Sequence, residues 1–411
     1  MFTSFSTALS ALGAHTTAVD VVGNNLANLN TPGFKGSAVS FADLVTQSLG
    51  AGLGETQVGF GVGRPVTLRQ FSQGAIQASN GPLDAAIQGD GFLVLKDDND
   101  AVKYTRGGNL LVDKSGNLLT AKGNRVQGWS AVGDTIDTNR PVGNIVVPVG
   151  SLRAPTASTA FNFETNLNAS SAIGERFSTS LEVFDSLGVN HVVTVAFTKS
   201  ATANQWDYAI TIPDADVTAP VTPVTGSISF TTSGVLATPD ATVAPPRLTI
   251  TGLRSGAADM NLDWQMYNGL TPRLTQYSQP SAVSANSQNG APASQLIRVG
   301  LADGGSILAQ YSNGQQVTVG RVAMASIRNP ESLIAAGDNT FVLSSRSALP
   351  AIGVAGSGGR GTILGGAVES STVDIAKEFT NLIVYQRGYQ ANSRVITTVD
   401  EISQETINLK R

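Results

Sequence analysis

Apolar residues recur at intervals of three and four along the first thirty residues of the chain. The positions that share this spacing are Phe2, Phe5, Leu9, Leu12, Val19, Val22, Leu26 and Leu29. Such spacing places an apolar seam along one face of an α-helix. The pattern stops at residues 30–33, where Pro32 cannot continue a helix and restricts the residue before it. We therefore predict an N-terminal helix that ends near this proline.

The last forty residues repeat the pattern. Their seam consists of Ile375, Phe379, Leu382, Tyr389, Ile396, Val399, Ile402 and Leu409, with polar residues between them. Ser371 or Thr372 could cap the start of this second helix. The helix would run nearly to Arg411 and would span about 50 Å, at about 1.5 Å per residue.

Two amphipathic segments at opposite ends of one chain are expected to pair with each other. The alternative is that each packs separately on a central domain. An isolated helix is marginally stable in water, and fully burying one seam side chain would gain about 1.5–3 kcal/mol. Because a pair of helices cannot cover a seam on all sides, we expect neighbouring subunits to cover the rest. The terminal helices are therefore predicted to be oligomerisation elements.

Between the ends, short alternating or apolar runs separated by turn residues predict β-strands. These runs lie at residues 86–95, 101–106, 110–112, 118–120, 125–129, 180–185, 191–198, 205–212, 247–250, 296–300, 307–311, 317–325 and 341–343. Residues 214–245, rich in Pro, Thr, Ala and Val, are typical of loops and edge strands. The fold class is predicted as mainly β with α-helical termini, with two or more nested β domains and a coiled-coil-like helix pair.

Composition narrows the class of protein. Hydrophobic residues make up 41 % and charged residues 14 % of the 411 residues, with 44 glycines, which suits a glycine-punctuated globular protein rather than a disordered one. A net charge of −4 gives no basic surface for nucleic acid. No apolar run reaches the ~18–20 residues of a membrane span. The chain has no cysteine, and its start lacks a basic and then apolar secretory signal, so any export would proceed without a cleaved signal.

Candidate chemistry is sparse. The two histidines, His15 and His191, lie far apart, and a metal or acid–base site needs ligands that converge. His15 falls off the seam and is predicted to face solvent, whereas His191 is interpreted as structural. The acidic run 97–100 lacks the spacing of a calcium loop and is interpreted as a hairpin tip. The glycine clusters at 59–63 and 356–361 lack phosphate-loop and dinucleotide patterns and are interpreted as flexible connectors. We predict no enzyme, no cofactor and no metal site.

Three blocks of sequence, in order, resemble the flagellar rod and hook protein family. The N-terminal block carries Asn24, Asn25, Asn28, Thr31, Gly33, Phe34 and Lys35, and the C-terminal block, which runs from Glu369 to Ser393, carries Gln386, Arg387 and Tyr389. The central block contains Ile87-Gln-Gly-Asp-Gly-Phe92, Tyr104-Thr-Arg106, Asp113-x-x-Gly116-x-Leu118 and Gly128-Trp129. Leu110 stands where the family often has phenylalanine, a small departure.

The resemblance implies a division into layers. Residues 1–31 with 372–411 would form an inner helical domain, residues 32–70 and 355–371 would be connecting segments, residues 71–149 with 287–354 would form a discontinuous β domain, and residues 150–286 an inserted outer β domain. Distal rod proteins of the family are shorter and lack such an insertion. The insertion, with residues 310–315 and the strand after them, favours a hook subunit; the alternative is a distal rod or other axial protein.

The same resemblance implies a function. The subunit would polymerise into a flexible tube that acts as a universal joint and transmits motor torque in the extracellular hook of the bacterial flagellum. Its partners would be other copies of itself, the distal rod protein, the hook cap, the hook–filament junction protein and the flagellar type III export apparatus. The glycine-rich segments 50–63 and 353–366 would let the layers tilt. The terminal helices would be disordered in the monomer and would order on assembly.

Overall fold

A computed structural model describes residues 2–44, 46–49, 56–133 and 135–408 of the chain. It confirms the predicted fold class, since most elements are β-strands and one long helix lies at each end. The chain divides into two compact units: the first comprises Met1–Val149, Arg298–Gln310 and Gln316–Arg411, and the second comprises Gly150–Ile297 and Tyr311–Gln315. The finer division into layers stays a prediction.

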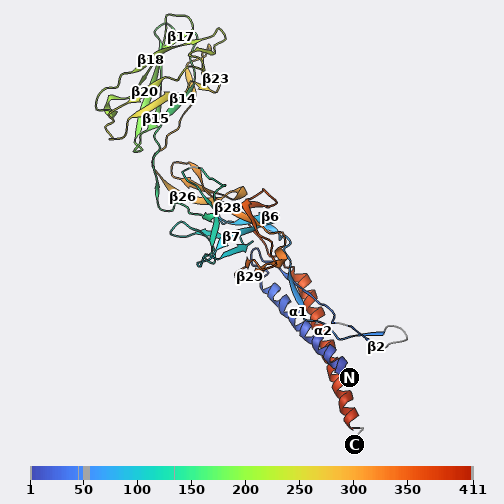
Figure 1. The fold of residues 1–411 in the computed structure, drawn as a ribbon. Helices are drawn as coiled ribbons and strands as arrows, with labels where there is room; N and C mark the ends of the chain where they lie inside the picture. Colours follow the sequence, from blue (N-terminus) through green and yellow to red (C-terminus); the bar gives the residue numbers. More distant parts are fainter. Residues whose placement is uncertain (1, 45, 50–55, 134, 409–411) are drawn as a thin grey trace. The chain divides into compact units, whose positions relative to one another are not determined.

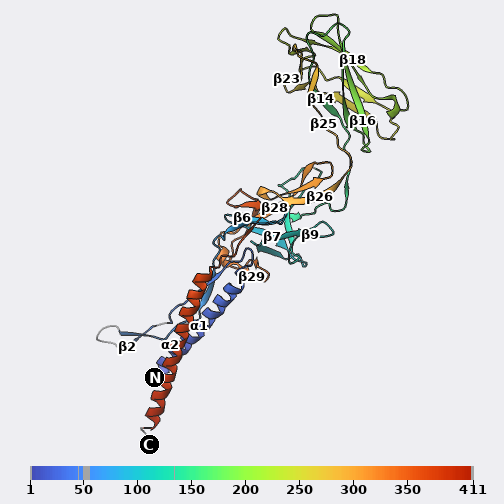
Figure 2. The same ribbon diagram turned by 180° about the vertical axis from the view of Figure 1, so that it is seen from behind.

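The two helices belong to the first unit and pack against each other. α1 (Phe2–Ala27) and α2 (Ile375–Asn408) run antiparallel, and the start of α1 and the end of α2 lie at the end of the pair remote from the main sheet of this unit (Figures 1 and 2). After α1, hydrogen-bonded turns lead to Pro32, where the sequence predicted that the helix would end. The predicted pairing of the terminal helices is therefore confirmed.

The predicted cap of α2 is wrong. Oδ1 of Asp374 accepts hydrogen bonds from the backbone N–H groups of Ala376, at 2.8 Å, and Lys377, at 3.1 Å. Asp374 is therefore the N-cap residue, in place of Ser371 or Thr372. An aspartate is as good a cap as serine or threonine, and its charge also suits the positive end of the helix dipole.

The strands of the first unit form one main sheet with smaller pairs beside it. The main path runs in the order β27-β28-β11-β7-β8-β30-β29. The bounds are β1 (Ser37–Ser40), β2 (Thr46–Leu49), β3 (Thr56–Gly59), β4 (Val66–Arg69), β5 (Ile76–Ala78), β6 (Ala85–Gln88), β7 (Phe92–Lys96), β8 (Val102–Thr105), β9 (Leu110–Val112), β10 (Leu118–Thr120), β11 (Arg125–Ser130), β12 (Gly143–Asn144), β27 (Ser306–Tyr311), β28 (Gln316–Ser326), β29 (Ile334–Ala335), β30 (Thr340–Val342), β31 (Ala351–Val354), β32 (Thr362–Gly365) and β33 (Ala367–Glu369). Short 3₁₀ turns lie at η2 (Asp303–Gly305) and η3 (Pro330–Ser332).

An aromatic cluster forms part of the core of this unit. The rings of Phe71, Phe92 and Phe341 meet edge to face, with centroids 5.3, 5.5 and 6.0 Å apart, the arrangement that aromatic pairs prefer. Residues 86–95, predicted as one strand, are instead β6 and β7. Gly89 and Gly91 separate them with φ values of 89° and 132°, which only glycine adopts readily. The hairpins at residues 96–101 and 112–118 are confirmed by the pairing of β7 with β8 and of β9 with β10.

The glycine-rich segment 353–366 is not the flexible connector that the sequence predicted. Part of it belongs to β31, which pairs with β28, and to β32, which pairs with β6. A Cβ atom at Gly361 would lie 2.2 Å from the carbonyl oxygen of Gln88, and one at Gly365 would lie 2.0 Å from that of Leu301. These glycines therefore allow backbones to pack closely. In the other predicted connector, residues 50–55 lie outside the described residues, and β3 pairs with β2.

The second unit contains two sheets around one hydrophobic core. One sheet has the order β15-β16-β17-β18-β19, and the other has the order β20-β21-β14-β24 with β25 beside β14. The bounds are β13 (Leu152–Arg153), β14 (Ala160–Asn166), β15 (Arg176–Phe184), β16 (Asn190–Lys199), β17 (Gln205–Thr211), η1 (Asp214–Asp216), β18 (Val224–Phe230), β19 (Leu236–Thr238), β20 (Arg247–Ile250), β21 (Met260–Trp264), β22 (Tyr267–Asn268), β23 (Thr271–Pro272), β24 (Leu274–Thr275) and β25 (Ala282–Gln288). β26 (Ser294–Leu301) continues into the first unit. Trp206 and Trp264 are fully buried in the core. Within residues 214–245, β18 pairs on both sides, so the prediction of only loops and edge strands is wrong there.

Candidate functional site

Large apolar side chains of the terminal helices lie in three environments. Six side chains of the predicted seam are exposed: Phe5, Leu9, Ile375, Phe379, Tyr389 and Ile402. Seven are half-buried, namely Leu12, Val19, Leu26, Leu29, Leu382, Ile396 and Val399, and Val22 is buried. The side chain of Phe2 and residue Leu409 lie outside the described part of the chain. The helix pair therefore leaves much of its apolar surface uncovered within the chain.

Small residues fill the contact between the two helices instead. The buried hydrophobic positions on α1 are Ala8, Ala11, Ala14, Ala18 and Val22. On α2, a Cβ atom at Gly388 would lie 2.6 Å from the ring of His15. Alanine and glycine let the two backbones approach closely, because no bulky side chain stands between them. The alanines sit at the same three- and four-residue spacing as the predicted seam, and that repeat was the signal missed in the sequence.

The prediction that His15 faces solvent is wrong. Its ring is half-buried and lies 5.6 Å from the ring of Phe41 and 6.3 Å from that of Tyr385, between centroids. The absence of a side chain at Gly388 makes room for it. His15 therefore takes part in the packing of α1 on α2.

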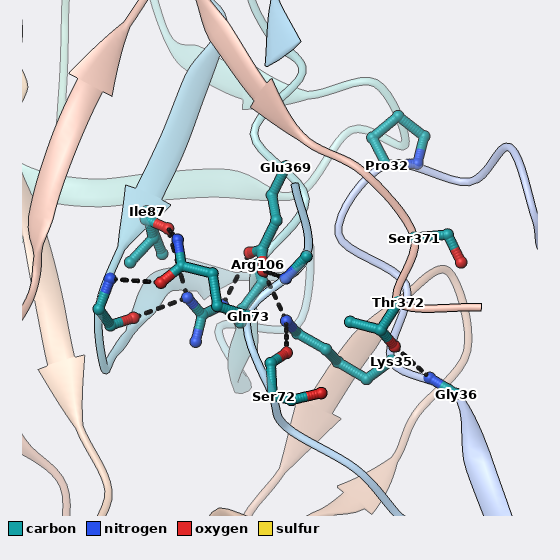
Figure 3. Close-up of polar contacts among 12 residues, drawn as sticks. Pro32, Lys35, Gly36, Ser72, Gln73, Ile87, Arg106, Glu369, Ser371 and Thr372 are labelled. Carbon is teal, nitrogen blue, oxygen red and sulfur yellow. Dashed lines mark hydrogen bonds and ion pairs between the residues drawn. The ribbon is translucent and has the colours of Figure 1, made fainter. Parts of the chain in front are cut away.

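Three buried charged side chains join the two ends of the chain to the β-strands of the first unit. Nζ of Lys35 lies 2.6 Å from Oε1 of Glu369, and Nε of Arg106 lies 2.9 Å from its Oε2. The side chains of Lys35 and Glu369 are completely inaccessible to solvent, and Arg106 is 3 % exposed. We call these residues the ion triad (Figure 3). Lys35 follows α1, Arg106 follows β8 and Glu369 ends β33.

Further hydrogen bonds complete the ion triad. Nζ of Lys35 donates to the carbonyl oxygen of Ser72 at 2.6 Å, and the N–H group of Gly74 donates to Oε1 of Glu369 at 2.8 Å. A terminal nitrogen of Arg106 donates to the carbonyl oxygen of Gly89 at 2.7 Å. Buried charges are tolerable only when they are paired and hydrogen-bonded in this way.

Two cations share one carboxylate in the ion triad, which sets the electrostatics of Lys35. Burial lowers the pKa of Lys35 below its ordinary value, and the charge of Arg106 lowers it further. The hydrogen bond and charge of Glu369 act in the opposite direction. Glu369 is therefore the group that keeps both cations in the protein interior.

Backbone contacts tie the same two chain segments together. The N–H group of Gly33 donates to the carbonyl oxygen of Glu369 at 2.7 Å, and that of Thr372 donates to Phe34 at 3.1 Å. The N–H group of Gly36 donates to the Thr372 hydroxyl at 3.0 Å (Figure 3). Gly33 has a φ of 68°, and a Cβ there would lie 2.6 Å from the backbone of Arg106. Only glycine meets both conditions.

Asn25 performs a similar role in the last turn of α1. It is buried, its amide nitrogen donates to the carbonyl oxygen of Ser37 at 2.8 Å and to Oε1 of Glu378 at 3.2 Å, and its oxygen accepts from the N–H of Ser37 at 3.0 Å. One side chain thus binds α1 to β1 and to α2. An alanine in its place would leave buried polar groups without partners.

The other motif residues have different environments. Gly33, Phe34 and Lys35 are buried, Asn28 and Thr31 are half-buried, and Asn24, Gln386, Arg387 and Tyr389 are exposed. Arg106 and Glu369 were quoted as part of the resemblance but not singled out as site residues. The sequence feature that could have marked them as buried charges is a single charged residue beside apolar or glycine-rich sequence, in a chain with only 14 % charged residues.

A second buried charge cluster lies in the second unit. Nε2 of His191 lies 3.1 Å from Asp185, and Nδ1 lies 3.2 Å from Asp216. Burial alone would raise the pKa of Asp185, but hydrogen bonds from Ser255, His191 and the backbone hold it below its ordinary value. The Ser255 hydroxyl donates to Asp185 and not to the histidine, so the three do not form a nucleophilic triad.

Within the part of the chain that the structure describes, no group of three or more histidine or acidic residues is arranged to hold a metal ion, and no helix is long and apolar enough to cross a membrane. The acidic run 97–100 forms a turn in which Oδ1 of Asp97 accepts from the N–H groups of Asn99 and Ala101, both at 2.9 Å.

Comparison with family models gives four matches in chain order. Residues 5–35 match the flagella basal body rod protein model, and residues 86–166 match the flagellar hook protein FlgE/F/G D1 domain. Residues 154–291 match the flagellar basal body protein FlaE D2 domain, and residues 364–409 match the flagellar basal body rod FlgEFG protein C-terminal model. Both sides of the ion triad, at Lys35 and Glu369, fall within matched segments.

Full-length relatives decide between rod and hook. The flagellar hook protein FlgE of Escherichia coli is 32 % identical over 421 residues, covering 99 % of this chain and 100 % of the relative. The chain belongs to the flagellar hook protein family. Hook proteins of Salmonella typhimurium, 33 % identical over 99 % of this chain, and Borreliella burgdorferi, 31 % identical over all of it, match along their whole length.

Membership of this family makes the chain a structural hook subunit and not an enzyme, and its place is the flagellar hook. The family also implies self-assembly. A crystal structure of Helicobacter pylori flagellar hook protein FlgE2 shares the fold, with a TM-score of 0.53 and 15 % identity, over 70 % of this chain and 99 % of that one.

Proposed function

We propose that this hook subunit polymerises into a flexible tube that acts as a universal joint and transmits motor torque. The terminal helix pair forms the inner layer, the β domain (71–149 with 287–354) the middle layer and residues 150–286 the outer layer. Contacts between different faces of identical subunits, which do not close into a ring, produce such helical assemblies.

The observation that carries this proposal is the uncovered apolar surface of the helix pair. Besides the exposed seam residues, the exposed large apolar side chains of α2 include Ile383, Val384, Val395 and Ile407. Soluble monomers rarely expose a large contiguous apolar patch. Covering each side chain would contribute up to about 1.5–3 kcal/mol, and neighbouring copies of the chain are the partners that cover them.

The ion triad supports the mechanical part of the proposal. It fixes the helix pair to the β-strands with buried ionic contacts from three distant segments of the chain. A load applied to the helices therefore reaches the β domain through several charge-assisted hydrogen bonds, which must break together for this junction to open. Bending of the tube is taken up between subunits, where contacts are exposed and weaker.

Partners outside the homopolymer follow from the same proposal. The ends of the tube meet the distal rod protein and the hook–filament junction protein, and the hook cap and the flagellar type III export apparatus act during assembly. The terminal helices order fully when neighbours cover them, since paired helices with exposed apolar faces are only partly stabilised on their own.

Electron microscopy of the purified chain tests the proposal. The wild-type chain should form tubes, and the double variant Leu9→Ser with Phe379→Ser should not, because both exposed apolar contacts are lost. The control is Leu349→Ser, which changes a side chain 90 % exposed outside the helices and should form tubes. Absence of tubes from the wild-type chain, or normal tubes from the double variant, would overturn the proposal.

A further inference from the structure

A small cavity lies where α1, the first turns of α2 and β1 meet. Its volume is about 90 Å³, and its lining includes Asn25, Ser37, Lys377 and Glu378. Lys377 is exposed, and its ammonium group forms no ion pair with Glu378. The cavity belongs entirely to the first unit. The space is large enough for the end of one polar side chain, and the groups that face it are mainly polar.

Glu378 presents an unsatisfied oxygen at this cavity. The residue is 9 % exposed, and its Oε1 accepts the hydrogen bond from Asn25 at 3.2 Å. Oε2 is buried and has no hydrogen-bond partner among the described residues. A buried carboxylate oxygen without a partner is costly, and native structures usually satisfy such a group. The cavity therefore suits a donor, and above all a positively charged one.

Two arginine side chains lie on the face of α2 opposite to Glu378. Arg387 lies nine residues after Glu378, which at about 100° per residue is half a turn away, and Arg394 lies seven residues further on nearly the same face. Both are exposed, and neither side chain has an ion-pair partner among residues 2–44, 46–49, 56–133 and 135–408. Arg387 is also about 13 Å along the helix axis from Glu378, so the two cannot meet within one chain.

We propose that the cavity receives a guanidinium group from α2 of a neighbouring copy of the chain, which pairs with Oε2 of Glu378. A subunit that assembles head to tail needs two different complementary faces. The orphaned carboxylate provides one, and the arginine face of α2 provides the other. A planar guanidinium reaches a carboxylate with directional, charge-assisted hydrogen bonds. The inference rests on the proposed self-assembly and specifies one contact of it.

A double-mutant cycle on assembled tubes tests this contact. Glu378→Gln removes the charge and keeps the oxygen that accepts from Asn25. It should speed the release of subunits from tubes about tenfold, and so should Arg387→Gln or Arg394→Gln. When Glu378→Gln is combined with the arginine variant that speeds release, Arg387→Gln or Arg394→Gln, the release rate should rise little further, because both changes remove the same ion pair. Glu331→Gln, an exposed change away from the helices, should release subunits at the wild-type rate.

Two results would overturn the inference. One is release by Glu378→Gln at the wild-type rate, and the other is an additive effect with both arginine variants, which would mean that the cavity holds only water. Should Glu378→Gln fail to fold, the exposed double variant Arg387→Gln with Arg394→Gln decides, and tubes of wild-type stability from it would contradict the inference. Failure of the wild-type chain to form tubes would instead count against the proposed function.

Discussion

Nζ of Lys35 lies 2.6 Å from Oε1 of Glu369, although the two residues are 334 positions apart and both side chains are fully buried. The contact brings together the segment after α1 and the segment before α2. Arg106, which pairs with the other carboxylate oxygen of Glu369 (Oε2), links both segments to the β-strands. The two ends of the chain are therefore ordered together with the β domain.

Glu369→Gln should destabilise the first unit strongly. It removes the only anion of the ion triad and leaves the cations of Lys35 and Arg106 buried near each other, a change that costs about 3–5 kcal/mol. Urea unfolding followed by the helical circular-dichroism signal measures it, since both long helices belong to this unit. Glu331→Gln, at an exposed position, is the control. Equal unfolding midpoints for the two variants would count against the role of the ion triad.

The ion triad also predicts a pH dependence. The pKa of Lys35 is lower in the folded chain than in the unfolded chain, so between these two values the unfolded state binds more protons and stability rises with pH. Lys35→Met lacks this contribution. The difference in unfolding free energy, wild type minus variant, should therefore increase with pH towards the ordinary lysine pKa of about 10.4. A difference that stays constant or decreases over that window would contradict the assignment.

Gly361→Ala should destabilise the first unit by at least about 1–3 kcal/mol, because the added Cβ would overlap the carbonyl oxygen of Gln88. Gly59→Ala, in the other glycine-rich segment, has nothing within 4 Å of the added atom and should change stability little. Thermal unfolding of both variants provides the comparison. Equal melting temperatures would restore the view that residues 353–366 are a free connector.

Ala18→Leu should weaken the helix pair. Ala18 is fully buried on α1, whose main packing partner is α2, and overpacking such a site costs about 1–3 kcal/mol. Ala27→Leu makes the same change at an exposed position on α1 and should be nearly neutral. Hydrogen exchange of α1 amides reports the result: faster exchange is expected for Ala18→Leu alone, and identical exchange in both variants would show that the alanine face does not set the helix contact.

The sequence predicted the helices well because their periodicity is local: residues three and four apart share a face whatever the rest of the chain does. It did not predict which face meets the partner helix. The large apolar residues at Leu9 and Phe379 attract attention as core, yet the alanines beside them make the contact, since close helix packing needs small side chains. The face of large apolar residues and the alanine face can be told apart only in the structure of the packed helix pair.

The ion triad could not be predicted for a different reason. Lys35, Arg106 and Glu369 come from three segments, and nothing in their spacing indicates that they meet. The segment around Gly361 shows the same limit, because a glycine that allows flexibility and one that allows close packing are identical in sequence. The family resemblance identified these segments, and the fold assigned their contacts.

Chemical labelling of single cysteines tests most directly the central claim that neighbouring copies cover the apolar face of the helix pair. The chain has no cysteine of its own, so Leu9→Cys and Phe379→Cys each introduce one reactive site, and Leu270→Cys, at a position 86 % exposed in the second unit, is the control. A maleimide should label all three variants as soluble subunits and only the control after tubes have formed. Equal labelling of Leu9→Cys and Phe379→Cys before and after assembly would contradict the claim.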